Sequence, residues 1–152
     1  MLTPSALQLP PLALYVHIPW CVQKCPYCDF NSHAQKQAIP EAEYVSALLD
    51  DLSADLAFVA GRTLSSIFIG GGTPSLFSTQ AIDQLLTGIR ERIPCDDDIE
   101  ITLEANPGTV EAGRFAGYQS AGVNRFSIGV QSFNPLQLQK LGRIHDPAQA
   151  VD

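Results

Sequence analysis

Short apolar runs alternate with amphipathic segments along the chain. The runs have the length and composition of buried strands, and they cover residues 12–18, 65–69, 99–105 and 123–130. The amphipathic segments repeat apolar side chains at spacings of three and four, which predicts helices with one buried face. These helices are expected over residues 41–60, 82–93 and 109–120. Gly61 suits a helix C-cap, and Asn134 with Pro135 has the chemistry that starts a fourth helix.

Four successive strand–helix units predict an α/β fold with parallel strands. Such crossovers are almost always right-handed and place the helices outside the sheet. The sheet is then either doubly wound or part of a barrel. A complete eight-unit barrel takes roughly 250 residues, so we interpret these 152 residues as the front part of a longer protein. Residues 1–11 form a tail, and the domain that starts at residue 12 continues beyond residue 152.

The unusual residues of the chain all follow predicted strands. In both architectures, functional groups collect at the C-terminal ends of parallel strands. Those ends carry a cysteine-rich loop, the run GGGTPS at 70–75, Glu104 before NPG, and Gln131. Gly71 and Gly72 would let a ligand approach bare backbone groups, although a tight turn alone also explains them. Glu104 and Gln131, taken singly, are typical of structural positions. We expect all of them on one edge of the sheet.

Charge and composition narrow the classes of partner. A formal net charge of −7, with nine Lys and Arg residues scattered along the chain, does not supply the basic surface that nucleic acid requires. The first 23 residues carry no charged side chain, but four prolines interrupt any helix there, and no basic segment precedes an apolar one. We therefore expect no nucleic-acid partner, no integral membrane segment and a cytoplasmic location.

The segment HIPWCVQKCPYCDFN holds three of the four cysteines. In a reducing compartment, such a cluster indicates a metal or redox site before a disulfide. Cys21, Cys25 and Cys28 have the spacing C-x3-C-x2-C, and thiolates are soft ligands that suit zinc or iron–sulfur clusters. A cubane of four irons needs one ligand per iron. Three thiolates would leave the fourth iron open to a substrate or cofactor.

Two other interpretations compete with the iron–sulfur cluster. Structural zinc usually takes four protein ligands in C-x2-C pairs, and the remaining cysteine, Cys95, lies far away in IPCDDD, where an inert thiol is expected. The sequence CPYC at 25–28 resembles a glutaredoxin-like thiol–disulfide site. Such a site begins a helix, however, whereas CPYCDFNSH continues as loop until Pro40, and Cys21 would have no role.

Four motifs, in this order, resemble the radical S-adenosylmethionine (SAM) superfamily: YVHIPWCVQKCPYCDFN, IFIGGGTPS, EANPG and GVNRFSIGVQSF…LGRIH. Within it they are similar to the branch that contains oxygen-independent coproporphyrinogen III oxidases and HemW-type haem chaperones. The likeness runs from about Leu12 to Asp146. It implies that residues 12–152 are the front of a radical SAM core domain. The fold would be an incomplete (β/α)6 partial TIM-type barrel with about four βα units present.

The resemblance also implies the cofactors. Cys21, Cys25 and Cys28 would hold a [4Fe-4S] cluster, and SAM would chelate the unique iron through its amino and carboxylate groups. One electron from the cluster can then cleave the C–S bond of SAM to give a 5′-deoxyadenosyl radical. By motif position, the residues around SAM would be Tyr15, Tyr27, Gly71, Gly72, Thr73, Glu104, Gln131 and Arg143. Glu104 can accept from the ammonium group, Arg143 can pair with the carboxylate, and Gln131 can bond to ribose hydroxyls.

Two departures from the oxidases favour the haem chaperone. The oxidases carry a further cysteine two residues past the third, where this chain has Phe30. They also have an N-terminal extension before the first strand, whereas in this chain only eleven residues precede it. The resemblance then implies haem as ligand of the full-length protein, haem-acceptor proteins as partners and a flavodoxin-like electron donor. The alternative is an enzyme that converts coproporphyrinogen III.

The haem ligands cannot be assigned from this sequence. The His-, Asn- and Trp-rich haem motif of the chaperones is absent from the 152 residues. His17, His33 and His145 qualify by residue type alone. We interpret His17, late in a strand among apolar neighbours, as a structural histidine whose ring nitrogens are hydrogen-bonded.

Overall fold

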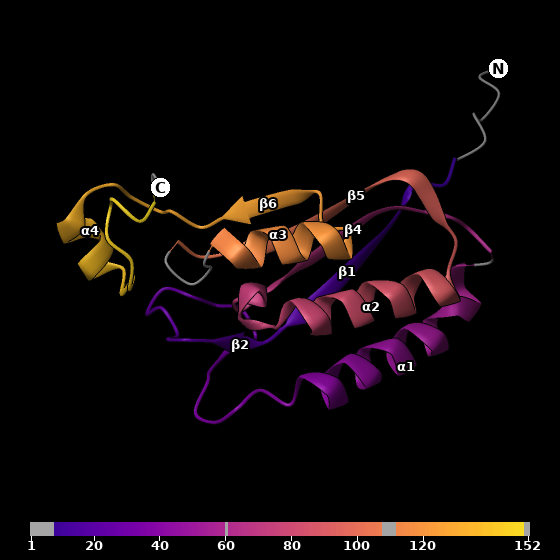
Figure 1. The fold of residues 1–152 in the computed structure, drawn as a ribbon, viewed down its shortest axis with the longest axis horizontal. Helices are drawn as coiled ribbons and strands as arrows, with labels where there is room; N and C mark the ends of the chain where they lie inside the picture. Colours follow the sequence, from indigo (N-terminus) through magenta and orange to yellow (C-terminus); the bar gives the residue numbers. More distant parts are fainter. Residues whose placement is uncertain (1–7, 60, 108–111, 151–152) are drawn as a thin grey trace, which may run out of the picture.

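The computed structural model describes residues 8–59, 61–107 and 112–150. A parallel sheet has the order β1-β4-β5-β6, and its strands are Leu12–Ile18, Leu64–Gly71, Cys95–Ala105 and Arg125–Ile128. The helices are α1 (Glu41–Val59), α2 (Thr79–Arg92), α3 (Ala112–Ala121) and α4 (Pro135–Lys140). Figure 1 shows α1, α2 and α3 on one face of the sheet, while α4 lies beyond the C-terminal end of β6. The predicted α/β fold with parallel strands is confirmed.

The alternation of side chains along the strands explains why the helices cover only one face. Val16 and Ile18 of β1, Ile69 of β4, and Ile101 and Leu103 of β5 point to the helices and are buried. They pack against apolar side chains of the helices, among them Ile82, Leu85, Leu86 and Ile89 of α2. Each fully buried aliphatic side chain contributes about 1.5–3 kcal/mol of transfer free energy. The hydrophobic core therefore lies between the sheet and its helices.

The opposite face of the sheet carries mainly polar and aromatic residues. Tyr15 lies beside Phe68 in the register, and Phe68 lies beside Thr102. Glu104 pairs in the same way with Ser127 nearer the C-terminal edge. No described helix packs on this face. It is therefore the face that would point to the interior of a barrel. Among the described helices, none combines the length and the apolar character needed to cross a membrane.

The helix termini follow the local sequence signals. Gly61 has a φ of +73°, a left-handed conformation that favours glycine and ends α1 as expected. Asn134 caps α4, because its Oδ1 accepts from the amides of Leu136 at 2.9 Å and Gln137 at 3.3 Å. The predicted helix over 109–120 is seen as α3, although residues 108–111 lie outside the described residues.

Three short elements were not expected. Strands β2 (Trp20–Cys21) and β3 (His33–Ala34) form a two-stranded parallel sheet. A 3-10 turn, η1 (Pro74–Leu76), follows the glycine run. Strand β5 also begins at Cys95, four residues before the predicted 99. The prediction missed residues 95–98 because this extended stretch is polar and carries no apolar alternation. The β2–β3 pair closes the cysteine loop at its base.

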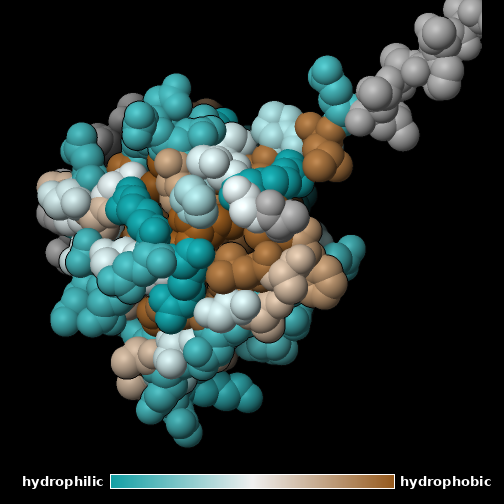
Figure 2. Space-filling model, turned by 90° about the vertical axis from the view of Figure 1, so that its right-hand side faces the viewer, coloured by the Kyte–Doolittle hydropathy of each residue, from teal (hydrophilic) through white to brown (hydrophobic). Residues whose placement is uncertain are grey.

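The core also has an opening at the edge of the sheet. A cavity of about 220 Å³ lies between β1, α1 and α2, lined mainly by leucine, isoleucine and valine side chains. Figure 2 views the molecule from the right-hand side of Figure 1, and it shows hydrophobic surface in a hollow with hydrophilic borders. The described fragment therefore leaves part of its apolar interior accessible.

Tyr118 offers a test of how the glycine-run loop is held to α3. Its hydroxyl is buried and lies 2.6 Å from the Phe77 carbonyl and 2.9 Å from the Ser75 carbonyl. Tyr118→Phe should destabilise the fold by about 1–3 kcal/mol, because the Phe77 carbonyl loses this buried donor, while the Ser75 carbonyl keeps the bond from Arg114 at 3.3 Å. Chemical denaturation of the full-length protein would measure this. Ser120→Ala, at an exposed hydroxyl on the same helix, is the control and should change stability by under about 0.5 kcal/mol.

Candidate functional site

The cysteine loop is fixed at both ends by the β2–β3 pair. The His33 amide donates to the Pro19 carbonyl at 2.8 Å, and the Gln35 amide donates to the Cys21 carbonyl at 2.7 Å. Within the loop, the Cys28 amide donates to the Cys25 carbonyl at 3.1 Å, which makes 25–28 a turn. CPYC does not begin a helix, as the sequence argument against a thiol–disulfide site requires.

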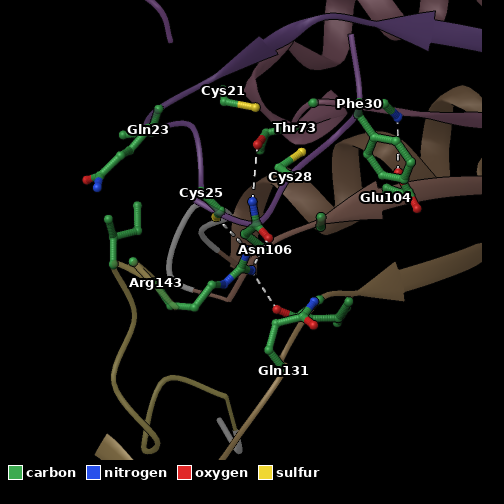
Figure 3. Close-up of a pocket in the computed structure, with 18 of the residues that line it drawn as sticks. Cys21, Gln23, Cys25, Cys28, Phe30, Thr73, Glu104, Asn106, Gln131 and Arg143 are labelled. Carbon is green, nitrogen blue, oxygen red and sulfur yellow. Dashed lines mark hydrogen bonds between the residues drawn. The ribbon is translucent and has the colours of Figure 1, made fainter. Parts of the chain in front are cut away.

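Three thiols face one cavity of about 370 Å³ at the C-terminal edge of the sheet (Figure 3). Its volume falls in the range of small-molecule sites. Cys21 is buried, Cys25 and Cys28 are partly exposed, and all three are free thiols. The other predicted cofactor residues that line this cavity are Tyr27, Gly71, Gly72, Thr73, Glu104, Gln131 and Arg143. Residues from the ends of three strands of the sheet (β4, β5 and β6) and from the cysteine loop thus meet at one place.

Tyr15 is the one predicted cofactor residue that does not line the cavity. It lies on the open face of β1 and is 57% exposed, with its hydroxyl 3.0 Å from Nδ1 of His17. Burial raises the pKa of Tyr15, and the nearby Glu104 charge adds to the rise. In the register of the sheet, Tyr15 is level with Phe68 and Thr102, before Glu104 in β5, and its contact with the cofactor stays a prediction.

His17 has a hydrogen-bond partner at each ring nitrogen. Nε2 lies 2.8 Å from the Asn31 carbonyl, which only accepts, so Nε2 carries the proton. Nδ1 of the neutral ring then accepts from the Tyr15 hydroxyl. The interpretation of His17 as a structural histidine is confirmed, and the residue ties the far end of the cysteine loop to β1.

The glycine run supports the cysteine loop. The Gly71 amide donates to Oε2 of Glu104 at 3.1 Å, and the residue has a φ of +117°. The Gly72 amide donates to the Ile18 carbonyl at 2.7 Å, and a Cβ at Gly72 would come within 2.5 Å of the Trp20 carbonyl oxygen. We expected these glycines to let a ligand approach the backbone. The missing side chain of Gly72 also makes room for the protein's own chain at β2, and the approach of a ligand stays a prediction.

Arg143 connects the cysteine loop to the strand ends. Its Nη1 donates to Sγ of Cys25 at 3.6 Å, and its Nη2 donates to the Gly129 carbonyl at 2.6 Å and to Oδ1 of Asn106. The Nδ2 of Asn106 in turn donates to Oγ1 of Thr73 at 3.1 Å. A continuous hydrogen-bonded chain therefore runs from Thr73 to Cys25 (Figure 3).

Asn106 is the site residue that the sequence argument missed. It directly follows the strand that carries Glu104, at the edge where functional groups collect, and this position was the available signal. The NPG motif suggested only a turn. Its two partners lie 33 and 37 residues away in the chain, so no local pattern contains them.

Two further side chains shape the cavity wall. Gln131 has a φ of +65°, the one non-glycine residue with positive φ among those described, and strained backbone of this kind clusters at functional sites. Tyr27 lies beside Cys25 and Arg143. Burial raises the pKa of Tyr27, and the Cys25 thiol adds to this effect while the Arg143 charge opposes it.

The remaining candidates, Cys95, His33 and His145, do not line the cavity. Cys95 begins β5 at the opposite end of the sheet, and burial raises the pKa of its thiol. His33 is exposed in β3. His145 is 5% exposed, and its Nε2 donates to the Val130 carbonyl at 3.1 Å. Burial lowers the pKa of His145, and the Arg143 charge lowers it further.

The donor groups of the cavity suit an iron–sulfur cluster with an amino-acid ligand. Three soft thiols lie beside a carboxylate, Glu104, and a guanidinium, Arg143. Nε of Arg143 is buried and has no hydrogen-bond partner in the described structure, so an incoming oxygen could satisfy it. Among the described residues, no three His, Cys, Asp or Glu side chains converge closely enough to hold a single metal ion.

Comparison with known proteins establishes the class. The sequence features of the radical SAM superfamily match residues 15–152, and the chain belongs to this family. Membership implies a [4Fe-4S] cluster and SAM as cofactors.

Within the family, the chain is closely related to haem chaperones. It is 63% identical over 144 residues to the haem chaperone HemW of Escherichia coli K12 and 65% identical over 147 residues to that of Haemophilus influenzae. These alignments cover 95% and 94% of the chain but 38% of each relative, so the chain spans about two fifths of their length.

A solved structure shares the fold. The radical SAM enzyme coproporphyrinogen III oxidase (HemN) of Escherichia coli superimposes with a TM-score of 0.81 at 32% identity. The match covers 92% of this chain and 32% of that one. The parallel sheet is therefore part of a radical SAM barrel of the TIM type, as the resemblance implied.

Gly72→Ala tests the contact between the glycine run and the cysteine loop. The added Cβ meets backbone atoms of Pro19 and Trp20, which cannot rotate away. We expect the loop to shift, so that both cluster loading and SAM binding fall. Iron and sulfide content would be measured together with SAM affinity by calorimetry. Normal cluster content with weakened SAM binding alone would contradict this account and indicate direct contact with SAM.

Proposed function

We propose that Cys21, Cys25 and Cys28 bind the [4Fe-4S] cluster and that SAM binds to its open iron. The observation that carries this proposal is the single cavity that these three thiols share with the glycine run, Glu104 and Arg143. With SAM bound, the cluster supplies the electron that cleaves the C–S bond of SAM. The protein's own contribution is to orient the ligand and to place charges around it.

The cavity residues have chemically distinct roles toward SAM. Glu104 is held at the wall by the Gly71 amide, so its carboxylate can accept from the ammonium group of SAM. Arg143 contributes a partly buried guanidinium for the carboxylate, and Gln131 an amide for the ribose hydroxyls. Tyr27 and Thr73 complete the wall. Opposite charges at fixed positions would orient the methionine end of SAM in a single direction.

We further propose that the full-length protein is a cytoplasmic haem chaperone that binds haem and delivers it to acceptor proteins. Its radical SAM centre would receive electrons from a flavodoxin-like donor. The identity of 63–65% to proteins named HemW supports this. Phe30 lines the cavity and is 61% exposed, at the position where the oxidases carry a further cysteine. Because Phe30 is apolar, this chain lacks the fourth thiol that the oxidase pattern has at this position.

The second candidate is an oxygen-independent coproporphyrinogen III oxidase. The TM-score of 0.81 to HemN favours it, since the two cavities would stand on the same strand ends. The substitution at Phe30 argues against it. The two candidates differ in whether the porphyrin is cargo or substrate, and this difference is measurable.

The cluster assignment predicts a specific pattern of cysteine variants. Anaerobic reconstitution of the full-length protein with iron and sulfide should give broad visible absorbance. Cys21→Ala, Cys25→Ala and Cys28→Ala should each abolish it, because a cubane with two protein ligands is labile. Cys95→Ala is the matched control and should keep it, since Cys95 lies at the far end of the sheet. If Cys21→Ala retains the chromophore while Cys25 and Cys28 cycle with glutathione, the thiol–disulfide alternative is correct.

The chaperone assignment predicts haem transfer without porphyrin chemistry. The full-length protein should bind haem stoichiometrically and pass it to an apo-acceptor, which difference absorbance would follow. Incubated anaerobically with SAM, a reductant and coproporphyrinogen III, it should give no decarboxylated product by mass spectrometry. Conversion of coproporphyrinogen III would instead establish the oxidase. The Escherichia coli HemN enzyme is the positive control for that assay.

A further inference from the structure

We propose that Asn106 is a positioning residue, which aims the guanidinium of Arg143 at the Cys25 sulfur and thereby raises the reduction potential of the cluster. The inference rests on the proposed function, because it concerns the cluster that the three cysteines would hold. Asn106 is absent from the residues that the family motifs place at SAM.

The amide of Asn106 is fixed at both ends. Its Nδ2 donates to Oγ1 of Thr73 at 3.1 Å, and its Oδ1 accepts from Nη2 of Arg143. A guanidinium only donates, so the oxygen must face Arg143, which settles the orientation of the amide. Thr73 is 3% exposed and stands at the start of η1, where it provides a rigid anchor.

The orientation of Arg143 depends on having two acceptors at one nitrogen. Nη2 bonds both to the Gly129 carbonyl and to Asn106. With Gly129 alone, the guanidinium could pivot about a single hydrogen bond. The second acceptor fixes its plane, and in that plane Nη1 reaches Sγ of Cys25 at 3.6 Å. Asn106 thus acts on Cys25 through Arg143 and does not touch the sulfur itself.

A hydrogen bond to a ligand sulfur alters the cluster electronically. It withdraws charge from the thiolate, and it favours the reduced cluster, which carries one more negative charge. Removing it should make reduction harder. The same displacement of Arg143 would weaken its hold on the SAM carboxylate.

The test is a redox titration of the reconstituted full-length protein, followed by electron paramagnetic resonance of the reduced cluster. With Asn106→Leu, the ratio of reduced to oxidised cluster at a fixed poise should fall about tenfold, the size expected for one charge-assisted hydrogen bond. For a one-electron couple, this corresponds to about 59 mV toward more negative potential. SAM affinity should fall by a similar factor. Asn106→Ala is the second variant, should leucine prevent folding.

Three comparisons make the result decisive. Arg143→Gln should shift the potential in the same direction, and adding Asn106→Leu to it should produce no further shift, because the two residues act in series. Thr73→Val, which removes only the anchoring hydroxyl, should give a smaller shift of the same sign. Asn124→Ala is the matched control: among the described residues, its side-chain amide bonds to Ile99 and Ile101 of β5, so the substitution should lower stability without changing the potential.

The failure of this inference differs from the failure of the proposed function. A normal cluster whose potential is unchanged in Asn106→Leu and Asn106→Ala would overturn the role of Asn106 alone. Additive shifts in the double variant would overturn it as well, since Asn106 would then act independently of Arg143. Failure of the unsubstituted protein to load a cluster would overturn both.

Discussion

The backbone of Gly72 lies directly against the backbone of Trp20, and the geometry of the site depends on that contact. The Gly72 amide donates to the Ile18 carbonyl and the Thr73 amide to the Trp20 carbonyl, both at 2.7 Å. These bonds join the end of β4 to the point where β1 gives way to the cysteine loop. The approach is too close for any side chain at residue 72. The loop is thereby held with its thiols toward the glycine run and the ends of β5 and β6.

The sheet separates stability from chemistry by the alternation of its side chains. In β1, Val16 and Ile18 face the helices and are buried. Tyr15 and His17, which alternate with them along the strand, face the uncovered side of the sheet. Glu104 belongs to that same open side, at the edge where it meets the Gly71 amide. Because the helices cover only one face, a polar network can form on the other without burying unpaired groups in the core.

The sequence signals that were local predicted the structure well. Short apolar runs located the four strands of the sheet, and Asn134 with Pro135 marked the start of α4. Cysteine spacing and strand ends predicted that the three thiols and Glu104 lie at one edge, and the family resemblance added Arg143; all of them line one cavity, although their roles toward SAM stay predictions. The β2–β3 pair was missed because strands of two residues have no periodicity.

The sequence did not indicate those features of the site that depend on contacts between distant segments of the chain. Asn106 looked like a turn residue because Thr73 and Arg143, to which its side chain bonds, lie in loops far away in the chain. Tyr15 belongs to the motif, yet the register of β1 sets it beside Phe68, and it does not line the cavity. Gly72 also serves a contact within the chain that the sequence did not indicate, because the Trp20 carbonyl oxygen that a side chain would meet belongs to a distant segment.

The bond between Arg143 and Cys25 joins residues 118 positions apart in the chain. During synthesis, the three thiols leave the ribosome early, while the guanidinium arrives only after every described strand has been made. Contacts of such separation form late, because the intervening chain must first be ordered. The young polypeptide therefore passes through a stage in which its thiols are present but unshielded, exposed to oxidation and to adventitious metals. Docking of Arg143 against Cys25, after the last described strand has been made, would end that stage and mark the earliest moment at which an intact centre can be assembled.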